Sequence, residues 1–282
     1  MRILITGSNG FTGGYLTSYL TSLGFTVFGL KSNLMDYNSL TKEIELVKPK
    51  IVYHLGALSF TALKDYKKYY ETNLLGTRNL LEALNLNSKE LMHIFVISSA
   101  SIYGNGYKLP IKEHFLPNPD SDYAVSKLAS EFVAKLFMEI LPITILRPFN
   151  YTGIGQDRNF IIPKIIHHFK KRKPIIELGN INVEREFNDV RNIVYLYSQL
   201  IMKVPTRDIF NICTAKSFSI KEIIEKCEKI TGHRIKIKSN NKLIRSNDSK
   251  KLLGNGDHLT KFVNLKFCYK IDDTLFWMLK NI

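Results

Sequence analysis

The chain has 282 residues, of which 45% are hydrophobic and 23% are charged. These proportions are ordinary for a globular protein and exclude a disordered, collagen-like or coiled-coil chain. The net charge is +15 at pH 7. Because the basic residues are scattered and no base-reading motif accompanies them, we attribute the excess mainly to a lysine-rich surface and expect no nucleic-acid partner.

Three widely spaced cysteines without a CxxC pair argue against a disulfide framework or a zinc finger. No apolar stretch approaches the roughly 18 residues of a membrane span. The amino terminus lacks the apolar region and cleavage site of a signal peptide. We therefore expect a soluble cytoplasmic protein that has no membrane partner.

The first half of the chain alternates short apolar runs with longer amphipathic segments. The runs at 3–5, 26–28, 51–53, 94–97 and 143–146 predict strands. Helices are predicted over 11–23, 71–86 and 121–140. Apolar runs without alternation are typical of strands buried on both faces. The pattern therefore predicts an α/β fold with a doubly wound parallel sheet.

After about residue 150 this rhythm breaks. A helix over 189–202, a strand over 209–212 and a helix that starts at the capping box Ser219-Ile220-Lys221-Glu222 are predicted there. We predict a first domain over 1–152, to which about 187–212 returns. Residues 153–186 and 213–282 would form a smaller carboxy-terminal α/β domain.

A GxxGxxG turn follows the first predicted strand, with its glycines at Gly7, Gly10 and Gly13. Glycines permit a tight turn and a close approach of the backbone to a pyrophosphate, and the helix that follows offers free N–H groups. The turn therefore predicts a dinucleotide site. The second strand ends without the acid that usually meets a free ribose 2′-hydroxyl, and its nearest acid is Asp36. Lys31 instead suits a 2′-phosphate, so NADP(H) is favoured over NAD(H).

A YxxxK pair, Tyr123 and Lys127, falls on one face of a predicted helix. An ammonium near a phenol favours the ionised phenol and equips it for proton transfer. Ser98-Ser99-Ala100-Ser101 follows the fourth strand. A serine there would lie over the cofactor crevice. YxxxK alone is common in lysine-rich chains, and the serines alone are consistent with ordinary loop hydrogen bonding.

Five motifs in order resemble the extended short-chain dehydrogenase/reductase family of nucleotide-sugar epimerases, dehydratases and reductases. They are GxxGxxG, His54-Leu55-Gly56-Ala57, Asn73-Leu74-Leu75-Gly76-Thr77, Ser98 to Gly104, and YxxxK. Segments 146–156, 184–191 and 244–248 further resemble those of GDP-4-dehydro-6-deoxy-mannose reductases, with departures at Glu186, Asn188 and Ser246-Asn247. The His54-Leu55-Gly56-Ala57 segment also departs from the family's pattern, at Gly56.

The resemblance implies a Rossmann-type cofactor domain, a nucleotide-sugar-binding second domain and a catalytic set of Ser99, Tyr123 and Lys127. It implies cofactor contacts at Gly7, Gly10, Phe11, Gly13, Lys31, Asn33, Leu34, Leu55, Gly56, Ala57, Asn73, Tyr123, Lys127 and Pro148. It implies substrate contacts at Ser99, Ser101, Asn150, Arg185, Arg245 and Asp248, and no metal. Helices 64–86 and 121–140 would form a homodimer interface.

The residues after Ser99 narrow the reaction that the resemblance implies. Ala100-Ser101 stand where the family's dehydratases carry an Asp-Glu pair, and Ser101 lacks the thiol of the 3,5-epimerases. We therefore expect NAD(P)H-dependent reduction of a nucleotide-linked 4-keto-6-deoxyhexose at C4, in deoxysugar biosynthesis for a surface polysaccharide. The alternatives are a nucleotide-sugar 4-epimerase with tightly bound NAD and a catalytically idle NADP-binding module.

The other chemistry-bearing residues have ordinary interpretations. His54 is expected in the core or at a strand end, and His167-His168 lack metal-ligand partners. Cys213, Cys227 and Cys268 are expected to be buried apolar residues. The basic run Lys170 to Lys173 is expected at the solvated end of a helix.

Overall fold

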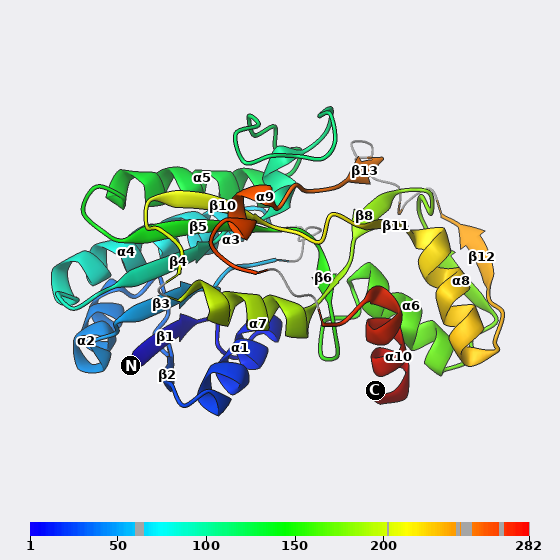
Figure 1. Ribbon diagram of the computed structural model, residues 1–282, viewed down its shortest axis with the longest axis horizontal. Coiled ribbons are helices and arrows are strands. Elements are labelled where there is room, and N and C mark those ends of the chain that lie inside the picture. Colours follow the sequence, from blue (N-terminus) through cyan, green and yellow to red (C-terminus); the bar gives the residue numbers. More distant parts are fainter. Residues whose placement is uncertain (60–64, 202, 241–242, 244–249, 265–267, 282) are drawn as a thin grey trace.

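The computed structural model describes residues 1–59, 65–201, 203–240, 243, 250–264 and 268–281. In this part of the chain the main sheet has six parallel strands in the order β10-β5-β4-β3-β1-β2 (Figure 1). Their bounds are β1 (Arg2–Thr6), β2 (Thr26–Gly29), β3 (Ile51–His54), β4 (His93–Ile97), β5 (Ile143–Pro148) and β10 (Asp208–Ile212). The predicted α/β class with a doubly wound parallel sheet is confirmed.

The strand order places the binding crevice. β2 and β3 lie on opposite sides of β1, so the direction in which strands are added reverses there. Ligands of open α/β sheets bind at such a switch point, outside the carboxyl ends of the strands. The GxxGxxG turn follows β1 and the His54-Leu55-Gly56-Ala57 segment ends β3, so both border this crevice.

Helices cover both faces of the sheet (Figure 1). One face packs against α1 (Phe11–Ser22) and α7 (Val190–Leu200), and the other against α2 (Tyr37–Val47), α4 (Gly76–Asn87) and α5 (Asp122–Phe137). Successive side chains of a strand point to opposite faces. In β1, Ile3 and Ile5 therefore enter the first core and Leu4 enters the second. This two-sided burial explains the apolar runs without alternation.

The predicted helix over 71–86 begins differently from a regular α-helix. α3 (Lys67–Tyr69) leads into a π-helical turn, η1 (Tyr70–Leu75), which precedes α4. Asn73 lies on this turn and is buried. Its side chain accepts from the N–H of Leu58 at 2.8 Å and donates to Ser126 Oγ at 3.0 Å. π-Helical turns often occur at functional sites.

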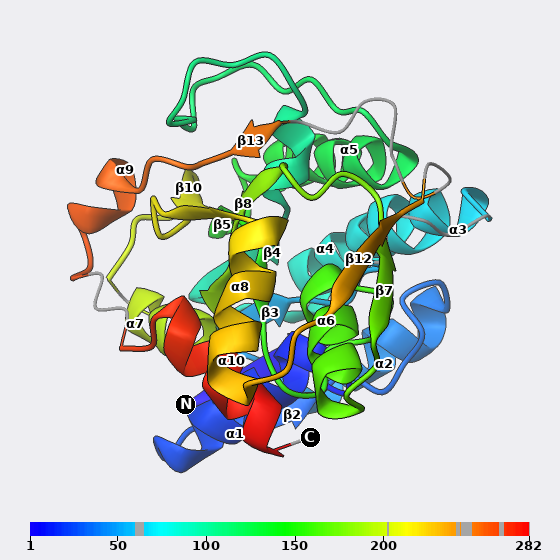
Figure 2. The same cartoon turned by 90° about the vertical axis from the view of Figure 1, so that its right-hand side faces the viewer.

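The second half forms a smaller layer beside the sheet. α6 (Ile161–Lys170), α8 (Ile220–Thr231) and α10 (Ile271–Asn281) pack around one apolar core (Figure 2). Three small sheets accompany them. They pair β7 (Ile175–Leu178) with β12 (Lys236–Ser239), β8 (Glu184–Glu186) with β11 (Ser217–Ser219) and β13 (Lys251–Leu252), and β6 (Tyr151–Thr152) with β9 (Asn188–Asp189). Short helices η2 (Ala100–Tyr103) and α9 (Asp257–Thr260) complete the described elements.

Several local predictions are confirmed. The capping box of α8 is formed by Ser219 and Glu222. The helix predicted over 189–202 is α7, and Lys171 to Lys173 are exposed beyond the end of α6. One prediction is wrong: Cys213 and Cys227 are buried, but Cys268 is exposed because it lies in a connecting segment before α10. Among the described helices, none combines the length and apolarity needed to cross a bilayer.

Candidate active site

The GxxGxxG turn requires glycine at its first and third glycine positions, Gly7 and Gly13. Gly7 has a φ of +68°, and a Cβ there would lie 2.9 Å from Gly56 Cα. A Cβ on Gly13 would lie 2.1 Å from the carbonyl oxygen of Gly7. The N–H of Gly10 donates to that same oxygen at 3.0 Å and closes the turn. The turn therefore lies directly against the segment that follows β3.

The amino terminus of α1 is open for a phosphate group. Gly10 caps the helix without a side-chain hydrogen bond, and Gly7, Asn9 and Gly10 are exposed. The Phe11 ring stacks on Tyr151 with 6.2 Å between ring centroids, and because a phenyl ring has no polar group, Phe11 can donate a hydrogen bond to a cofactor only through its backbone N–H. Unpaired N–H groups at a helix start attract anions. The turn and helix together fit the pyrophosphate of a dinucleotide.

The loop after β2 contains an acid that the sequence analysis missed. Glu43 on α2 accepts hydrogen bonds from the backbone N–H groups of Lys31 and Ser32. Burial raises the Glu43 pKa, but the hydrogen bonds from Ser32 and Lys31, and to a smaller degree the charge of Lys31, lower it below its usual value. Asn33 is exposed, whereas the Leu34 side chain is in the core and leaves only its backbone for a cofactor. The acid was missed because it lies beyond the strand end in sequence.

A buried hydrogen-bond chain supports the crevice from below. The N–H of Gly56 donates to Thr6 Oγ1, which is 2.8 Å from His54 Nδ1. His54 Nε2 is 2.8 Å from Thr77 Oγ1, and that hydroxyl donates to the carbonyl oxygen of Asn73. Because the Thr77 hydroxyl gives its proton to Asn73, it must accept a hydrogen bond from His54, so the His54 proton is on Nε2. Burial first, and then the charge of Lys127, lowers the His54 pKa to about 3. His54 is thus a neutral core residue, as expected.

The structure brings Ser99 and Tyr123 together. Ser99 is the second residue after the end of β4, its hydroxyl lies near enough to the Tyr123 phenol to affect the pKa of that phenol, and its Oγ lies 2.8 Å from that of Ser101. Tyr123 stands in the first turn of α5, which is capped by Ser121. Burial raises the pKa of Tyr123 to about 12, although the Ser99 hydrogen bond opposes the rise. The phenol is therefore protonated at neutral pH.

Lys127 lies one turn further along α5 and is buried. Its Nζ donates to the carbonyl oxygen of Ile97 at the end of β4. Burial lowers the Lys127 pKa to about 8, against the opposing charge of Glu131. We expected this ammonium to favour the ionised form of Tyr123. The structure does not show this effect, because burial is the largest influence on the Tyr123 pKa and Lys127 is hydrogen-bonded to the backbone.

A buried ion pair lies behind these residues. Glu131 accepts two hydrogen bonds from Arg147, at 2.9 and 2.7 Å. Arg147 also donates to the Tyr103 hydroxyl at 2.8 Å, and Tyr103 donates to Asn211. These contacts join α5 to β5, η2 and β10. The spacing of these residues along the chain does not predict this network. Pro148, the next residue of β5, is buried.

The predicted substrate residues are placed only in part. Asn150 is exposed after β5, and Arg185 is half-buried on β8, where Nη1 donates to the carbonyl oxygen of Glu184. Leu55 and Ala57 are half-buried beside the glycine turn. Arg245 and Asp248 lie outside the described residues.

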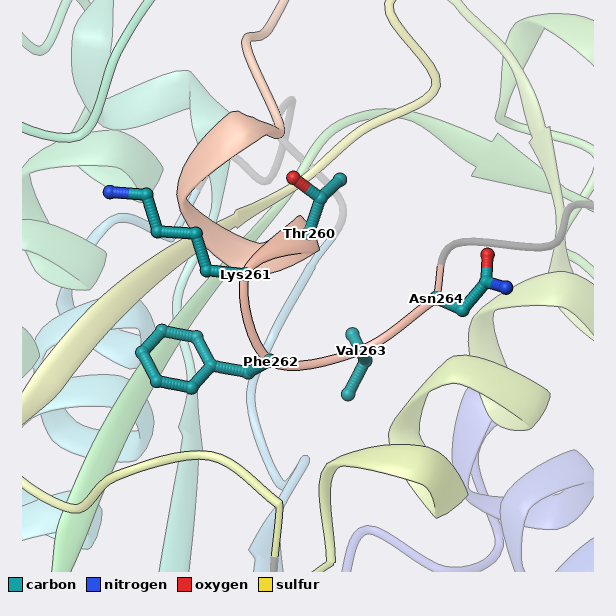
Figure 3. A pocket seen from close by; sticks show the side chains of 5 residues that line it. All are labelled: Thr260, Lys261, Phe262, Val263 and Asn264. Carbon is teal, nitrogen blue, oxygen red and sulfur yellow. The ribbon is translucent and has the colours of Figure 1, made fainter.

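One surface hollow lies apart from this site. A surface hollow of about 350 Å³ is lined by the segment from Thr260 to Asn264 after α9 (Figure 3). None of the predicted site residues lines it. Among the described residues, no group of three or more His, Cys, Asp or Glu side chains is arranged so that it could bind a metal ion.

Comparison with known proteins identifies relatives of this chain. GDP-6-deoxy-D-talose 4-dehydrogenase of Aggregatibacter actinomycetemcomitans is 33% identical over 92% of this chain and 90% of that protein. GDP-6-deoxy-D-mannose reductase of Pseudomonas aeruginosa is 32% identical over 79% of this chain and 78% of that protein. The solved structure of RMD from Pseudomonas aeruginosa complexed with NADPH is 28% identical, with a TM-score of 0.91 over 99% of this chain and 97% of that one.

The family model for the NAD dependent epimerase/dehydratase family matches residues 3–213. That range contains the glycine turn, the serine cluster and the YxxxK pair. The chain therefore belongs to the NAD-dependent epimerase/dehydratase family.

Proposed function

We propose that this protein reduces the 4-keto group of a nucleotide-linked 4-keto-6-deoxyhexose with a reduced nicotinamide dinucleotide. The observation that carries the proposal is that Ser99, beyond the carboxyl end of β4, lies beside Tyr123 of α5, with Lys127 one turn further along that helix. The two GDP-sugar oxidoreductases among the relatives support the substrate class.

The protonation state of Tyr123 suits reduction. A phenol whose pKa is raised to about 12 carries its proton at neutral pH. It can therefore donate that proton to the 4-oxygen of the sugar as the ketone becomes an alkoxide. Ser99 offers a second hydrogen bond to the same oxygen. Donors arranged in advance around a developing oxyanion lower the barrier of such a reaction.

The other requirements of the reaction are a hydride donor, a positive charge near the crevice and contacts that hold the cofactor and the nucleotide sugar. When bound, the nicotinamide supplies a hydride to the ketone carbon. The sugar thus gains a hydride at C4 and a proton at O4, and Tyr123 regains its proton from solvent. Lys127, held by Ile97, presents a positive charge beneath the crevice. Gly7, Gly10 and Gly13 would receive the pyrophosphate, and Asn150, Ser101, Arg185, Arg245 and Asp248 would contact the nucleotide sugar.

The side chains next to Ser99 favour simple reduction over dehydration. Removal of water across C5–C6 requires an acid and a base. Ala100 is apolar, and the Ser101 hydroxyl is engaged with Ser99 at 2.8 Å. Neither side chain is a carboxylate. Besides the reduced dinucleotide, reduction at C4 requires only the hydroxyl, phenol and ammonium groups already present.

The test is to mix the purified protein with NADH or NADPH and GDP-4-keto-6-deoxymannose, or its dTDP counterpart, and follow nicotinamide absorbance. We expect oxidation of the cofactor and a 6-deoxy-sugar product. Tyr123→Phe should lose about 100- to 10,000-fold in kcat while still binding cofactor. Tyr37→Phe, which removes a phenol hydroxyl from α2, is the matched control and should keep full activity.

The outcomes distinguish the alternatives. Cofactor that copurifies, together with interconversion of UDP-glucose and UDP-galactose without net oxidation, would identify a 4-epimerase instead. Cofactor binding without turnover of any nucleotide sugar would identify an idle binding module. Either result would overturn the proposal.

We also infer that two copies pair through α4 and α5, which lie side by side over one face of the sheet (Figure 1). Val125, Phe132 and Leu136 on α5 have exposed fractions of 38%, 57% and 72%. A charge at the centre of an apolar interface opposes association. Leu136→Glu should therefore sediment as a monomer. Leu46→Glu alters a leucine that is 83% exposed on α2, outside the two helices of the inferred interface, and this variant should remain a dimer. A monomeric wild type would refute the inference.

A further inference from the structure

The carboxylate of Glu43 is bound into the loop after β2 by three hydrogen bonds. Oε1 accepts from the N–H of Lys31 at 2.9 Å. Oε2 accepts from the N–H of Ser32 at 2.7 Å and from its hydroxyl at 2.5 Å. The carboxylate thus uses the two successive backbone N–H groups that a bound anion would otherwise take.

Glu43 is ionised at neutral pH. Burial raises its pKa, but the hydrogen bonds from Ser32 and Lys31 and the charge of Lys31 together lower the pKa below its usual value. The Lys31 ammonium therefore already faces a negative charge. A phosphate group at this loop would therefore be attracted less strongly by Lys31 than the sequence alone suggests.

This loop lies where the ribose of a dinucleotide is expected. The N–H of Leu30 donates to the carbonyl oxygen of Ile5, which holds the start of the loop beside β1. A Cβ on Gly29 would lie 2.3 Å from Ser8 Oγ, so the end of β2 directly contacts the glycine turn. In sheets of this kind the pyrophosphate lies on that turn and the adenosine ribose lies near the end of the second strand.

We propose that Glu43 is a specificity-determining residue, which favours a ribose with a free 2′-hydroxyl and so makes NAD(H) the preferred cofactor. The inference rests on the proposed use of a nicotinamide dinucleotide and reverses the preference for NADP(H) drawn from Lys31. A 2′-phosphate adds about two negative charges at neutral pH. Placed at this loop, it would repel the carboxylate and find the N–H groups of Lys31 and Ser32 occupied.

The test measures cofactor affinity and needs no sugar. Fluorescence titration gives the Kd of NADH and of NADPH for the wild type, Glu43→Gln and Glu45→Gln. The glutamine at 43 keeps an acceptor oxygen but removes the charge. We expect the wild type to bind NADH more tightly. Glu43→Gln should shift the ratio of the two Kd values about tenfold toward NADPH, the size of one charge–charge contact near a surface.

Glu45→Gln is the matched control, because Glu45 is exposed on the same helix and has no contact with the loop among the described hydrogen bonds. It should leave the ratio unchanged. Tighter binding of NADPH by the wild type would overturn the proposal, and this measurement needs no variant to fold. An equal change of both Kd values in Glu43→Gln would also overturn it, since Glu43 would then only shape the loop. Preference for NADH without reduction of any ketosugar would instead refute the proposed reaction alone.

Discussion

The buried pair of Glu131 and Arg147 provides a quantitative test of the structure. The two side chains are 0% and 3% exposed and share two hydrogen bonds. Glu131→Gln keeps the shape of the side chain but removes its charge. Arg147 stays positive, because a guanidinium keeps its proton even when it is buried. The variant therefore leaves an uncompensated charge in the interior.

The cost of that charge follows from its burial. Breaking one side of a buried ion pair costs about 3–5 kcal/mol. A folded protein is stable by about 5–15 kcal/mol in all, so the loss is a large share of the total. For a chain of this size each kcal/mol lowers Tm by about 2–4 °C. We therefore expect Glu131→Gln to melt about 6–20 °C below the wild type.

Thermal unfolding followed by circular dichroism measures this change. The control is the double variant Glu131→Leu with Arg147→Met, which removes both charges and keeps the volume apolar. Such replacements of a whole pair are often close to neutral. The double variant should recover more than half of the loss, although Tyr103 forfeits one hydrogen bond. A Glu131→Gln variant that melts within about 2 °C of the wild type would refute this reasoning.

Two further predictions concern the site. Gly13→Ala should abolish cofactor binding in a titration, because the new Cβ would lie 2.1 Å from the carbonyl oxygen of Gly7. Gly14→Ala is the control and should bind cofactor normally, because the atom nearest to its Cβ is 3.8 Å away. Equal binding by both variants would contradict the proposed turn. The kcat/KM for ketosugar reduction should fall as pH rises through about 8, since Lys127, whose pKa burial lowers to about 8, is charged below that pH and neutral above it. Lys127→Arg, which keeps its charge at every accessible pH, should lose this fall, and a wild-type profile that stays flat above pH 8 would exclude Lys127 as its source.

The sequence alone determined the class of fold. Apolar runs such as Ile3 to Ile5 carry no alternation because both faces of β1 are buried, and that burial is itself the mark of a covered parallel sheet. The glycine turn was equally predictable. A φ of +68° at Gly7 and the absence of space at Gly13 are local requirements, which the residue types express directly.

Only the tertiary structure decided the electrostatics. Glu43 reaches the end of β2 from a helix, and Lys127 bonds the end of β4, so neither contact follows from spacing along the chain. The sequence suggested an ammonium that acidifies Tyr123, yet burial raises that pKa to about 12. Periodicity and backbone constraints are properties of neighbouring residues. Desolvation and the choice of charge partner depend on which distant segments pack together, and the packing of the helices on the sheet determines those contacts.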